Sequence, residues 1–498
     1  MIVMNILLIT SDQQRWDAIS YQNPLVKTPN IERLKKRGIA FDRGYTCSPV
    51  CTPTRVSVLT GHYPSKHGCN TIGTSLPENY PTIPEKLSEK GYFTGLIGKG
   101  HFMSCLTPGN FEAAPNIFDR ELFQKWDGPY YGFDYTKLAI GHSNENHAAG
   151  GHYGLWLEEQ GINTEDYFGS GESSDFGTWN LPEEFSNSKW TADETIEAIN
   201  LADQKESPFF LWSSFQDPHN PWVVPEPWAS MYEKSDVPVY GLKEGEMENK
   251  PPYYKNLADG KMYADEPELN VNGMAAPCVT ALPFMDDEKQ KEIMKKYYGM
   301  ISQMDHHIGR ILDHLEETGL IDETLIVFTS DHGDYMGNHG LWWKGLPAYE
   351  DIQKIPLVVS HPDCKTPGSR SDALQSLVDL GITFLKAAGS EPEPGIQGVN
   401  QTETWKDCTK EKRSWTTVEF RPTESSFMQK TFITKQYKLV VYHNRAYGEL
   451  YDLEKDPDQM NNLWKSKSME SVKYQLLQEL ITAEMEKDGV LRPRTDIS

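Results

Sequence analysis

Short runs of apolar residues alternate with amphipathic segments along most of this chain. The apolar runs predict buried β-strands at Ile6–Thr10, Phe93–Ile97, Phe209–Phe215, Leu325–Thr329 and Ile355–Ser360. Apolar residues at helical spacing predict helices at Ile31–Arg37, Thr82–Glu89, Trp190–Asp203, Asp286–Glu317 and Ala373–Ala388. This alternation predicts an α/β fold in which helices sandwich a large mixed, mainly parallel sheet, with the chemistry at the carboxyl ends of the strands.

Two stretches, residues 104–188 and 222–282, interrupt this pattern. Both are rich in Gly, Pro, Asn and aromatic residues and lack a long periodic segment, so they are predicted to be irregular insertions. Aromatic side chains of the first insertion either form a wall on which sugars stack or pack beneath loops. These side chains are Trp126, Tyr130, Tyr131, Phe133, Tyr135, Trp156 and Trp179.

The end of the chain has a different pattern. Glu391–Gly395 (Glu-Pro-Glu-Pro-Gly) reads as a linker, which predicts a catalytic domain over residues 1–390 and a C-terminal α+β subdomain over residues 396–498. Within the subdomain, a small antiparallel sheet is expected from Thr431–Ile433, Lys438–Tyr442 and Glu449–Asp452. A closing helix is expected at Ser468–Glu486.

Composition limits which molecules the protein is expected to bind and in which cellular compartment it is expected to lie. A formal net charge of −24 repels nucleic acid and anionic lipid, and it also opposes long, densely sulfated polymers. No apolar run reaches the roughly 20 residues of a membrane helix, so no membrane partner is expected. Residues 1–10 lack a basic segment and a cleavage site, which favours a cytoplasmic protein, or a periplasmic one if a signal was trimmed. Seven scattered cysteines, an odd number, fit a reducing compartment.

Pairs of possible metal ligands follow two of the predicted strands. Asp12 and Gln13 come directly after the first strand, and Asp331 and His332 come after Leu325–Thr329. An aspartate in such a place can equally be a turn or a helix cap, but two such pairs at the ends of separate strands favour a metal site. Ligation mainly by oxygen suits Ca²⁺ or Mg²⁺.

Cationic side chains follow strands in the same way. Lys99 and His101 follow Phe93–Ile97, His219 follows Phe209–Phe215, and Lys344 stands thirteen residues after Asp331. Isolated lysines are mostly solvated and isolated histidines are often structural, so position after a core strand is what singles these residues out. The other histidines, among them His142, are interpreted as structural, although His142 lies in an insertion that can border the pocket.

Cys51 begins the run Cys-Thr-Pro-Thr-Arg of residues 51–55, and Leu-Thr-Gly follows at residues 59–61. This run resembles the C-x-P-x-R…L-T-G signature of the type I sulfatases of the alkaline phosphatase superfamily. Gly98–His101 is similar to the family's G-K-W-H motif with Gly100 in place of Trp, and residues 218–221 resemble its P-H-x-P element. Residues 28–34 and 448–463 extend the resemblance over nearly the whole chain.

The resemblance implies a mechanism. A maturation enzyme would oxidise Cys51 to formylglycine, whose hydrate supplies the nucleophilic oxygen. Ca²⁺, or Mg²⁺, would be held by the residue-51 side chain and by Asp12, Gln13, Asp331 and His332. The catalytic residues would be Cys51, Arg55 (orienting the hydrate), Lys99 and Lys344 (binding sulfate), Asp331 and His101 (accepting protons) and His219 (protonating the leaving alcohol).

Two departures keep an alternative open. Many sulfatases have Asp-Asp where this chain has Asp12-Gln13, and Asn where it has His332; phosphonate monoester hydrolases resemble this variant set. The expected function is therefore hydrolysis of a sulfated carbohydrate, with phosphonate or phosphate ester hydrolysis as the alternative, which Lys99 and His101 oppose. An acidic chain with a two-lysine pocket suggests exo action on short oligosaccharides. A binding protein on an inactive scaffold is a third hypothesis, which the complete set of catalytic residues opposes.

Overall fold

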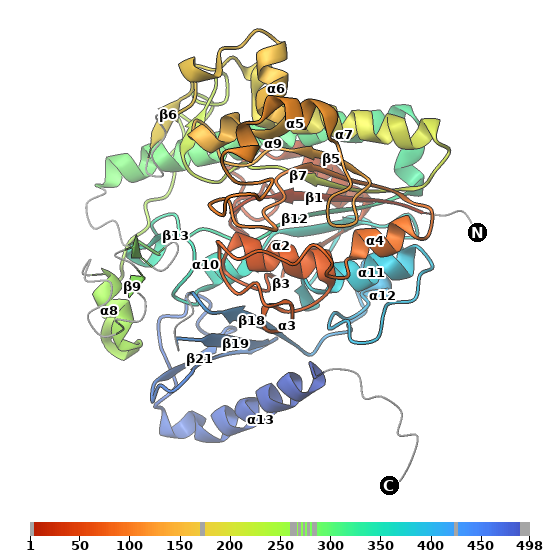
Figure 1. The fold of residues 1–498 in the computed structure, drawn as a ribbon. Helices are drawn as coiled ribbons and strands as arrows, with labels where there is room; N and C mark the ends of the chain where they lie inside the picture. The colour runs from red at the N-terminus through yellow and green to blue at the C-terminus, as the bar shows by residue number, and fades with distance from the viewer. Residues whose placement is uncertain are drawn as a thin grey trace, which may run out of the picture.

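Parallel strands form the centre of the main sheet (Figure 1). The computed structural model describes residues 4–169, 175–258, 266, 270–271, 274–275, 279–280, 286–422 and 427–488. Across the sheet the strands are β16 (Ser369–Ser371), β2 (Ile39–Phe41), β15 (Leu357–Ser360), β12 (Thr324–Ser330), β1 (Asn5–Ser11), β7 (Phe209–Ser214), β4 (Phe93–Gly98) and β5 (Tyr135–Leu138). The run from β12 to β5 is parallel throughout, and β15 is antiparallel to both of its neighbours. The predicted mixed, mainly parallel sheet is confirmed.

Strand β1 shows why the sheet needs helices on both faces. All of its residues are buried, and successive side chains enter opposite cores. Ile6 and Leu8 pack with α2 (Cys51–Thr60), α4 (Ile83–Ser88) and α11 (Asp379–Ala387). Leu7 and Ile9 pack with α1 (Pro29–Arg37), α7 (Asn187–Gln204) and α9 (Asp287–Glu317) on the other face.

The C-terminal region contains the predicted antiparallel sheet and closing helix. The sheet has the order β18 (Trp415–Phe420), β19 (Gln429–Thr434), β20 (Tyr437–Tyr442) and β21 (Gly448–Asp452), and α13 (Glu470–Glu486) packs on it. Tyr45 and Leu374 share a buried cluster with Val418 and Ile433 of this sheet. The domain boundary at residues 391–395 stays a prediction.

Several predicted boundaries were wrong. Pro356 divides the predicted strand Ile355–Ser360, because β14 (Lys354–Ile355) pairs with β3 (Gly44–Tyr45) while β15 joins the main sheet. The predicted helix Ala373–Ala388 begins only at Asp379, since β17 (Gln375–Ser376) pairs with β3 first. The stretch 104–188 was predicted to be irregular, yet it contributes β5, the edge strand of the main sheet.

Shorter elements complete the described chain. The helices are α3 (Pro64–His67), α5 (Arg120–Lys125), α6 (Gly151–Glu159), α8 (Pro252–Ala258), α10 (Glu350–Gln353) and α12 (Thr402–Lys406). The strands are β6 (Phe176–Thr178), β8 (Trp222–Val224), β9 (Asn270–Val271), β10 (Met274–Ala275), β11 (Val279–Thr280) and β13 (Trp342–Trp343). Part of the predicted 222–282 insertion, with Cys278, lies outside the described residues. Within the described ranges, no helix combines the length and apolarity that a bilayer-crossing segment requires.

The aromatic residues of the first insertion pack inside the protein. Tyr130, Tyr131 and Phe133 are buried in the core beside α2, while Trp156 and Trp179 pack around a separate cluster that includes Tyr153. The packing interpretation therefore holds for these side chains. None of them lines the cavity that contains Lys99 and His101, whereas Tyr130 and Tyr131 line a separate cavity of about 270 Å³, so a sugar-stacking role for them stays a prediction.

Candidate active site

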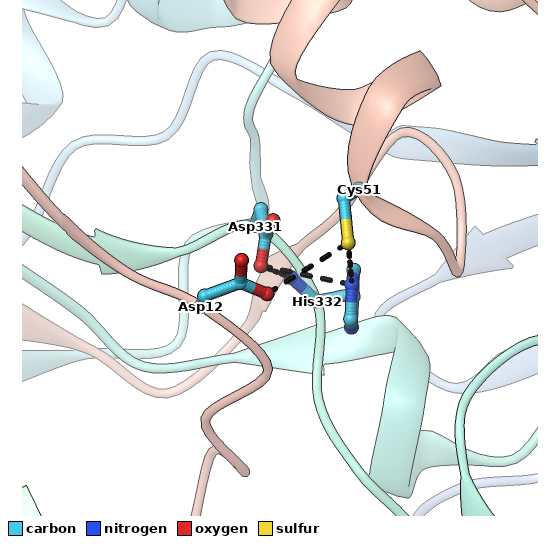
Figure 2. Close-up of side chains that lie close together, drawn as sticks. All are labelled: Asp12, Cys51, Asp331 and His332. Carbon is cyan, nitrogen blue, oxygen red and sulfur yellow. Dashed lines mark hydrogen bonds and ion pairs between the residues drawn. The ribbon is translucent and has the colours of Figure 1, made fainter. Parts of the chain in front are cut away.

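The carboxyl ends of the parallel strands bring the predicted site residues together. Asp12 and Gln13 follow β1, Lys99 and His101 follow β4, His219 follows β7, and Asp331 and His332 follow β12. Cys51 and Arg55 come from α2, and Lys344 directly follows β13. Figure 2 shows Asp12, Cys51, Asp331 and His332 converging on one point. The topology thus gathers groups far apart in sequence, such as Gln13 and Asp331, which are 318 positions apart.

Tight backbone turns aim these side chains. Gln13 and His101 have φ angles of 64° and 61°, a conformation that is uncommon for residues with a side chain and is often found at functional sites. Gly98 has φ 94°, and a Cβ there would lie 2.0 Å from the carbonyl oxygen of Ser214. Only glycine therefore lets β4 turn beside β7 and present Lys99 to the site.

Cys51 is the first residue of the fully buried helix α2. Its Sγ lies 2.9 Å from Lys344 Nζ, 3.9 Å from Lys99 Nζ and 3.2 Å from His332 Nε2. Burial and Asp12 raise the pKa of the thiol. Lys344, Lys99 and His332 lower it by more, so the pKa lies well below its usual value. The helix N-terminus adds partial positive charge. Negative charge at this position is therefore stabilised.

Arg55 holds the two site aspartates in place. Its Nε donates to Asp331 Oδ2 at 2.9 Å, its Nη2 lies 3.4 Å from Asp12 Oδ2, and its Nη1 donates to Ser214 Oγ at 2.8 Å. Lys99 Nζ also contacts Asp12 Oδ2. The Oδ2 atoms of Asp12 and Asp331 are thus bound by Arg55 and Lys99. Oδ1 of Asp12 lies 3.7 Å from Cys51 Sγ, and Oδ1 of Asp331 lies 3.8 Å from His332 Nε2.

This donor set fits a divalent cation. Ligand atoms of Asp12, Cys51, Asp331 and His332 all lie within 4.8 Å of one another. His332 Nδ1 donates to the carbonyl oxygen of Gly333 at 2.9 Å, which leaves the lone pair of Nε2 available to a metal.

Gln13 fits the same role through its amide. Its Nε2 donates to Asp334 Oδ2 at 2.5 Å and to Asn220 Oδ1 at 3.2 Å. Its buried Oε1 has no hydrogen-bond partner among the described residues, as expected of an oxygen that ligates a cation. Fixing the amide nitrogen in this way determines which end of the side chain faces the site.

Lys344 and His219 form a pair on the opposite side of Cys51. Lys344 Nζ donates to His219 Nε2 at 2.7 Å, and both side chains lie beside the Cys51 sulfur. Burial, His142 and Lys344 hold the pKa of His219 well below its usual value. In this state the imidazole is neutral, and Lys344 is the proton-bearing partner.

His142 is the site residue that the sequence interpretation missed. Its ring stacks on that of His219 with centroids 3.4 Å apart and planes at 9°. Its Nε2 lies 2.7 Å from Lys99 Nζ and 3.6 Å from Asp12 Oδ2. His142 follows β5 as the other site residues follow their strands, and the available signal was overlooked because residues 104–188 were treated as irregular.

A cavity of about 370 Å³ opens beside this cluster. Lys99, His101 and His142 line it. Burial lowers the pKa of His101 to about 4, although a hydrogen bond with Cys51 opposes the change, so His101 is neutral at pH 7 and able to accept a proton. An anionic group bound at Cys51 would meet two lysines, while the rest of the molecule extends into the cavity.

The fold and the residues at its strand ends define a hydrolase of the alkaline phosphatase superfamily. A family model described as Sulfatase matches residues 4–390, so the chain belongs to the sulfatase family. A further model, N-sulphoglucosamine sulphohydrolase, C-terminal, matches residues 337–486. The chain is an enzyme that hydrolyses sulfuric esters.

Relatives of known name agree with this assignment. An arylsulfatase of Clostridium perfringens is 29% identical over 97% of this chain and 94% of its own length. An N-acetylglucosamine-6-O-sulfatase of Bacteroides thetaiotaomicron is 25% identical over 95% of this chain and 85% of its own. The solved structure of a phosphonate monoester hydrolase of Agrobacterium radiobacter superposes with a TM-score of 0.78 at 24% identity, covering 97% and 96% of the two chains, which shows a shared fold.

Proposed function

We propose that this sulfatase removes sulfate from the end unit of a short sulfated carbohydrate, using formylglycine at position 51 and a divalent cation. The observation that carries the proposal is the placement of Lys99, Lys344, His101 and His219 around the Cys51 sulfur, with Lys99 and His101 also lining a cavity of about 370 Å³. Two cations on one anion and two histidines for proton transfer are what sulfate ester cleavage requires.

Formylglycine would supply, as its hydrate, an oxygen nucleophile at the position that Cys51 Sγ marks. The run Cys-Thr-Pro-Thr-Arg at residues 51–55 is the pattern that a formylglycine-generating maturation enzyme would recognise. The 2.9 Å ion pair between Arg55 and Asp331 fixes these two side chains next to residue 51. Asp331, whose carboxylate lies within 4.8 Å of the Cys51 sulfur, would accept the proton of the nucleophile.

The residues around Cys51 divide the remaining work. Lys99 and Lys344 bind the sulfate oxygens and offset the charge that grows there in the transition state. Lys344 keeps its charge and, 2.7 Å from His219 Nε2, holds that ring in place. When the anionic substrate offsets Lys344, His219 would take up a proton from solvent at Nε2 and donate it to the leaving alcohol. His101 accepts the second proton through a neutral ring nitrogen. General acid–base steps of this kind contribute ~10²–10⁴-fold.

A divalent cation would polarise the sulfate oxygens and the nucleophile when bound. Asp12, Asp331, His332, Gln13 and the residue-51 side chain would hold it. Oxygen donors favour Ca²⁺ or Mg²⁺, and the imidazole of His332 widens the choice towards Mn²⁺.

A carbohydrate end unit is supported by the size and chemistry of the cavity. Its volume of about 370 Å³ lies near the lower end of small-molecule sites, which span ~300–1,000 Å³. Asn146, His147 and Glu145 line it and suit hydroxyl groups. The N-acetylglucosamine-6-O-sulfatase relative agrees with a sugar substrate.

The test is co-expression with a maturation enzyme, followed by a peptide mass for residue 51. Sulfate release is then measured from sulfated monosaccharides, from oligosaccharides sulfated at the end or internally, and from an aryl sulfate. Cys51→Ala is the control. Release from end-sulfated sugars is expected. Cleavage of aryl sulfate alone, with residue 51 converted, would overturn the carbohydrate assignment.

Phosphonate or phosphate ester hydrolysis is the second candidate. The Asp12-Gln13 and Asp331-His332 pairs favour it, because they depart from the carboxylate and amide set of many sulfatases. Lys99 and His101 oppose it. A matched aryl phosphonate in the same assay decides between the two, since dominant phosphonate cleavage would promote this candidate.

A further inference from the structure

The cavity beside the active site is lined mainly by one loop. Residues 140–147, between β5 and the next helical turn, supply most of its wall, and Cys105 and Leu106 supply the rest beyond Lys99 and His101. Leu106 is 83% exposed. Because Lys99 and His101 mark the sulfate end, this loop faces the part of the substrate next to the sulfate.

Glu145 brings a negative charge into this wall. Its Oε2 accepts from His142 Nδ1 at 3.3 Å, and its side chain remains 26% exposed. Burial alone would raise the pKa of this carboxyl, but His142 and Lys99 lower it below the usual value. Glu145 is therefore a carboxylate at neutral pH.

The cavity provides no separate cation for a second negative group. Among its lining residues in the described part of the chain, Lys99 is the sole lysine or arginine, and it already contacts Asp12. His147 carries a buried Nε2 that has no hydrogen-bond partner among the described residues. Beyond Lys99 and the histidines, the described part of the wall therefore consists of one carboxylate, one amide and apolar groups, and Glu145 is its one acidic side chain.

We propose that Glu145 is a specificity-determining residue, which selects a leaving sugar without a negative charge and rejects a uronate or a second sulfate on the same unit. This inference rests on the proposed carbohydrate sulfatase activity. A carboxylate ~8 Å from Glu145 at an effective dielectric constant of ~20–40 is opposed by enough Coulomb energy for a loss of about 6- to 30-fold. The hydroxyl groups of a neutral sugar instead donate hydrogen bonds to Glu145.

The test compares two sugars that differ in charge alone. Methyl glucopyranoside and methyl glucopyranosiduronate are sulfated at the 2-, 3- or 4-hydroxyl, so that each pair differs at C6 between a hydroxymethyl group and a carboxylate. For an enzyme that accepts only 6-sulfates, the pair is N-acetylglucosamine 6-sulfate and N-sulfoglucosamine 6-sulfate, which differ by a second negative group on the same unit. For the pair sulfated at the position that the enzyme accepts, kcat/KM of the wild type should favour the neutral sugar by about 6- to 30-fold. Glu145→Gln, whose amide oxygen still accepts from His142, should bring this ratio close to one, mainly through KM.

Two further variants control the test. Glu145→Asp keeps the charge and should keep the preference, while Glu121→Gln removes an 85% exposed carboxylate elsewhere and should change nothing. A wild type that cleaves both sugars equally, or a Glu145→Gln ratio equal to the wild-type ratio, overturns the inference. Cleavage of an aryl sulfate but of no sulfated sugar overturns the proposed function itself, and the inference falls with it.

Discussion

Replacing Lys344 with methionine tests the electrostatic core of the proposed mechanism. Methionine is unbranched and one atom shorter than lysine, so it fills most of the same space and removes the charge. In the structure, Lys344 is 3% exposed, and its Nζ lies 2.9 Å from the Cys51 sulfur and 2.7 Å from His219 Nε2. The substitution therefore removes both a cation from the sulfate position and the hydrogen bond that orients His219.

The expected loss follows from these distances. Two unit charges ~4 Å apart interact by about 4 kcal/mol at an effective dielectric constant of ~20. The substrate already carries part of this charge when it binds, so only the increase in the transition state affects kcat. Loss of one preorganised donor lowers kcat by ~10²–10³. We expect a fall of about 10³ in kcat/KM and about 10² in kcat.

The assay is hydrolysis of an aryl sulfate by enzyme whose residue 51 has been verified by peptide mass. Lys125→Met is the matched control, because that lysine is 72% exposed on α5, pairs with Glu121 and has no part in the proposed mechanism. A thermal melt establishes that Lys344→Met is folded. Unchanged kcat/KM in a folded, fully converted Lys344→Met enzyme would refute the assignment of Lys344 to the sulfate position.

Three other outcomes are expected. Cys51→Ser should give at most one turnover and a sulfated peptide at residue 51, because a serine ester cannot expel sulfate by forming an aldehyde; sustained turnover would contradict this. Chelation should abolish sulfate release, and titration with Ca²⁺, Mg²⁺ and Mn²⁺ should identify the ion that restores it; activity that resists exhaustive chelation would exclude a metal role. Glu419→Gln should lower the free energy of unfolding by about 3 kcal/mol at pH 7, measured in urea, since Lys487 and Lys430 lower the pKa of this buried carboxyl to about 2.

The pH dependence of the Glu419 effect has a definite sign. A folded-state pKa below the unfolded value of ~4.3 contributes stability that is complete above the unfolded value. This contribution is lost as the pH falls towards about 2. The difference between wild type and Glu419→Gln should therefore shrink from pH 5 downwards, and a difference that stays constant to pH 3 would show that charge pairing is not its source.

Much of the site was predictable because each strand end is visible in sequence. Asp12, Lys99, His219 and Asp331 each follow a short apolar run, and parallel strands place their carboxyl ends at one edge. The boundaries and sheet partners that the sequence did not reveal also have physical reasons. Pro356 ended one pairing and began another, and no periodicity reveals which sheet a two-residue strand such as β14 joins. Strand β5 is short and surrounded by loop-forming residues, so its place in the main sheet was hidden.

His142 was not predicted as a site residue because strand β5, which precedes it, was not predicted. His142 follows β5, and its stacking on His219 depends on the order of β7, β4 and β5 across the sheet. Glu145 acquires its place through His142, and nothing in its immediate sequence separates it from the surface glutamates.

The sequence by itself determined the alternation of strands and helices, the Cys51 motif and the residue types available for chemistry, because local periodicity and motif spacing are properties of neighbouring residues. The tertiary structure decided which of those residues meet. Strand order brought His142 onto His219. Asp334 and Asn220 fixed the amide of Gln13, and the loop after β5 placed Glu145 against His142 in the wall of the cavity. These contacts join segments far apart in the chain, so the energy that sets them exists only once the sheet has formed.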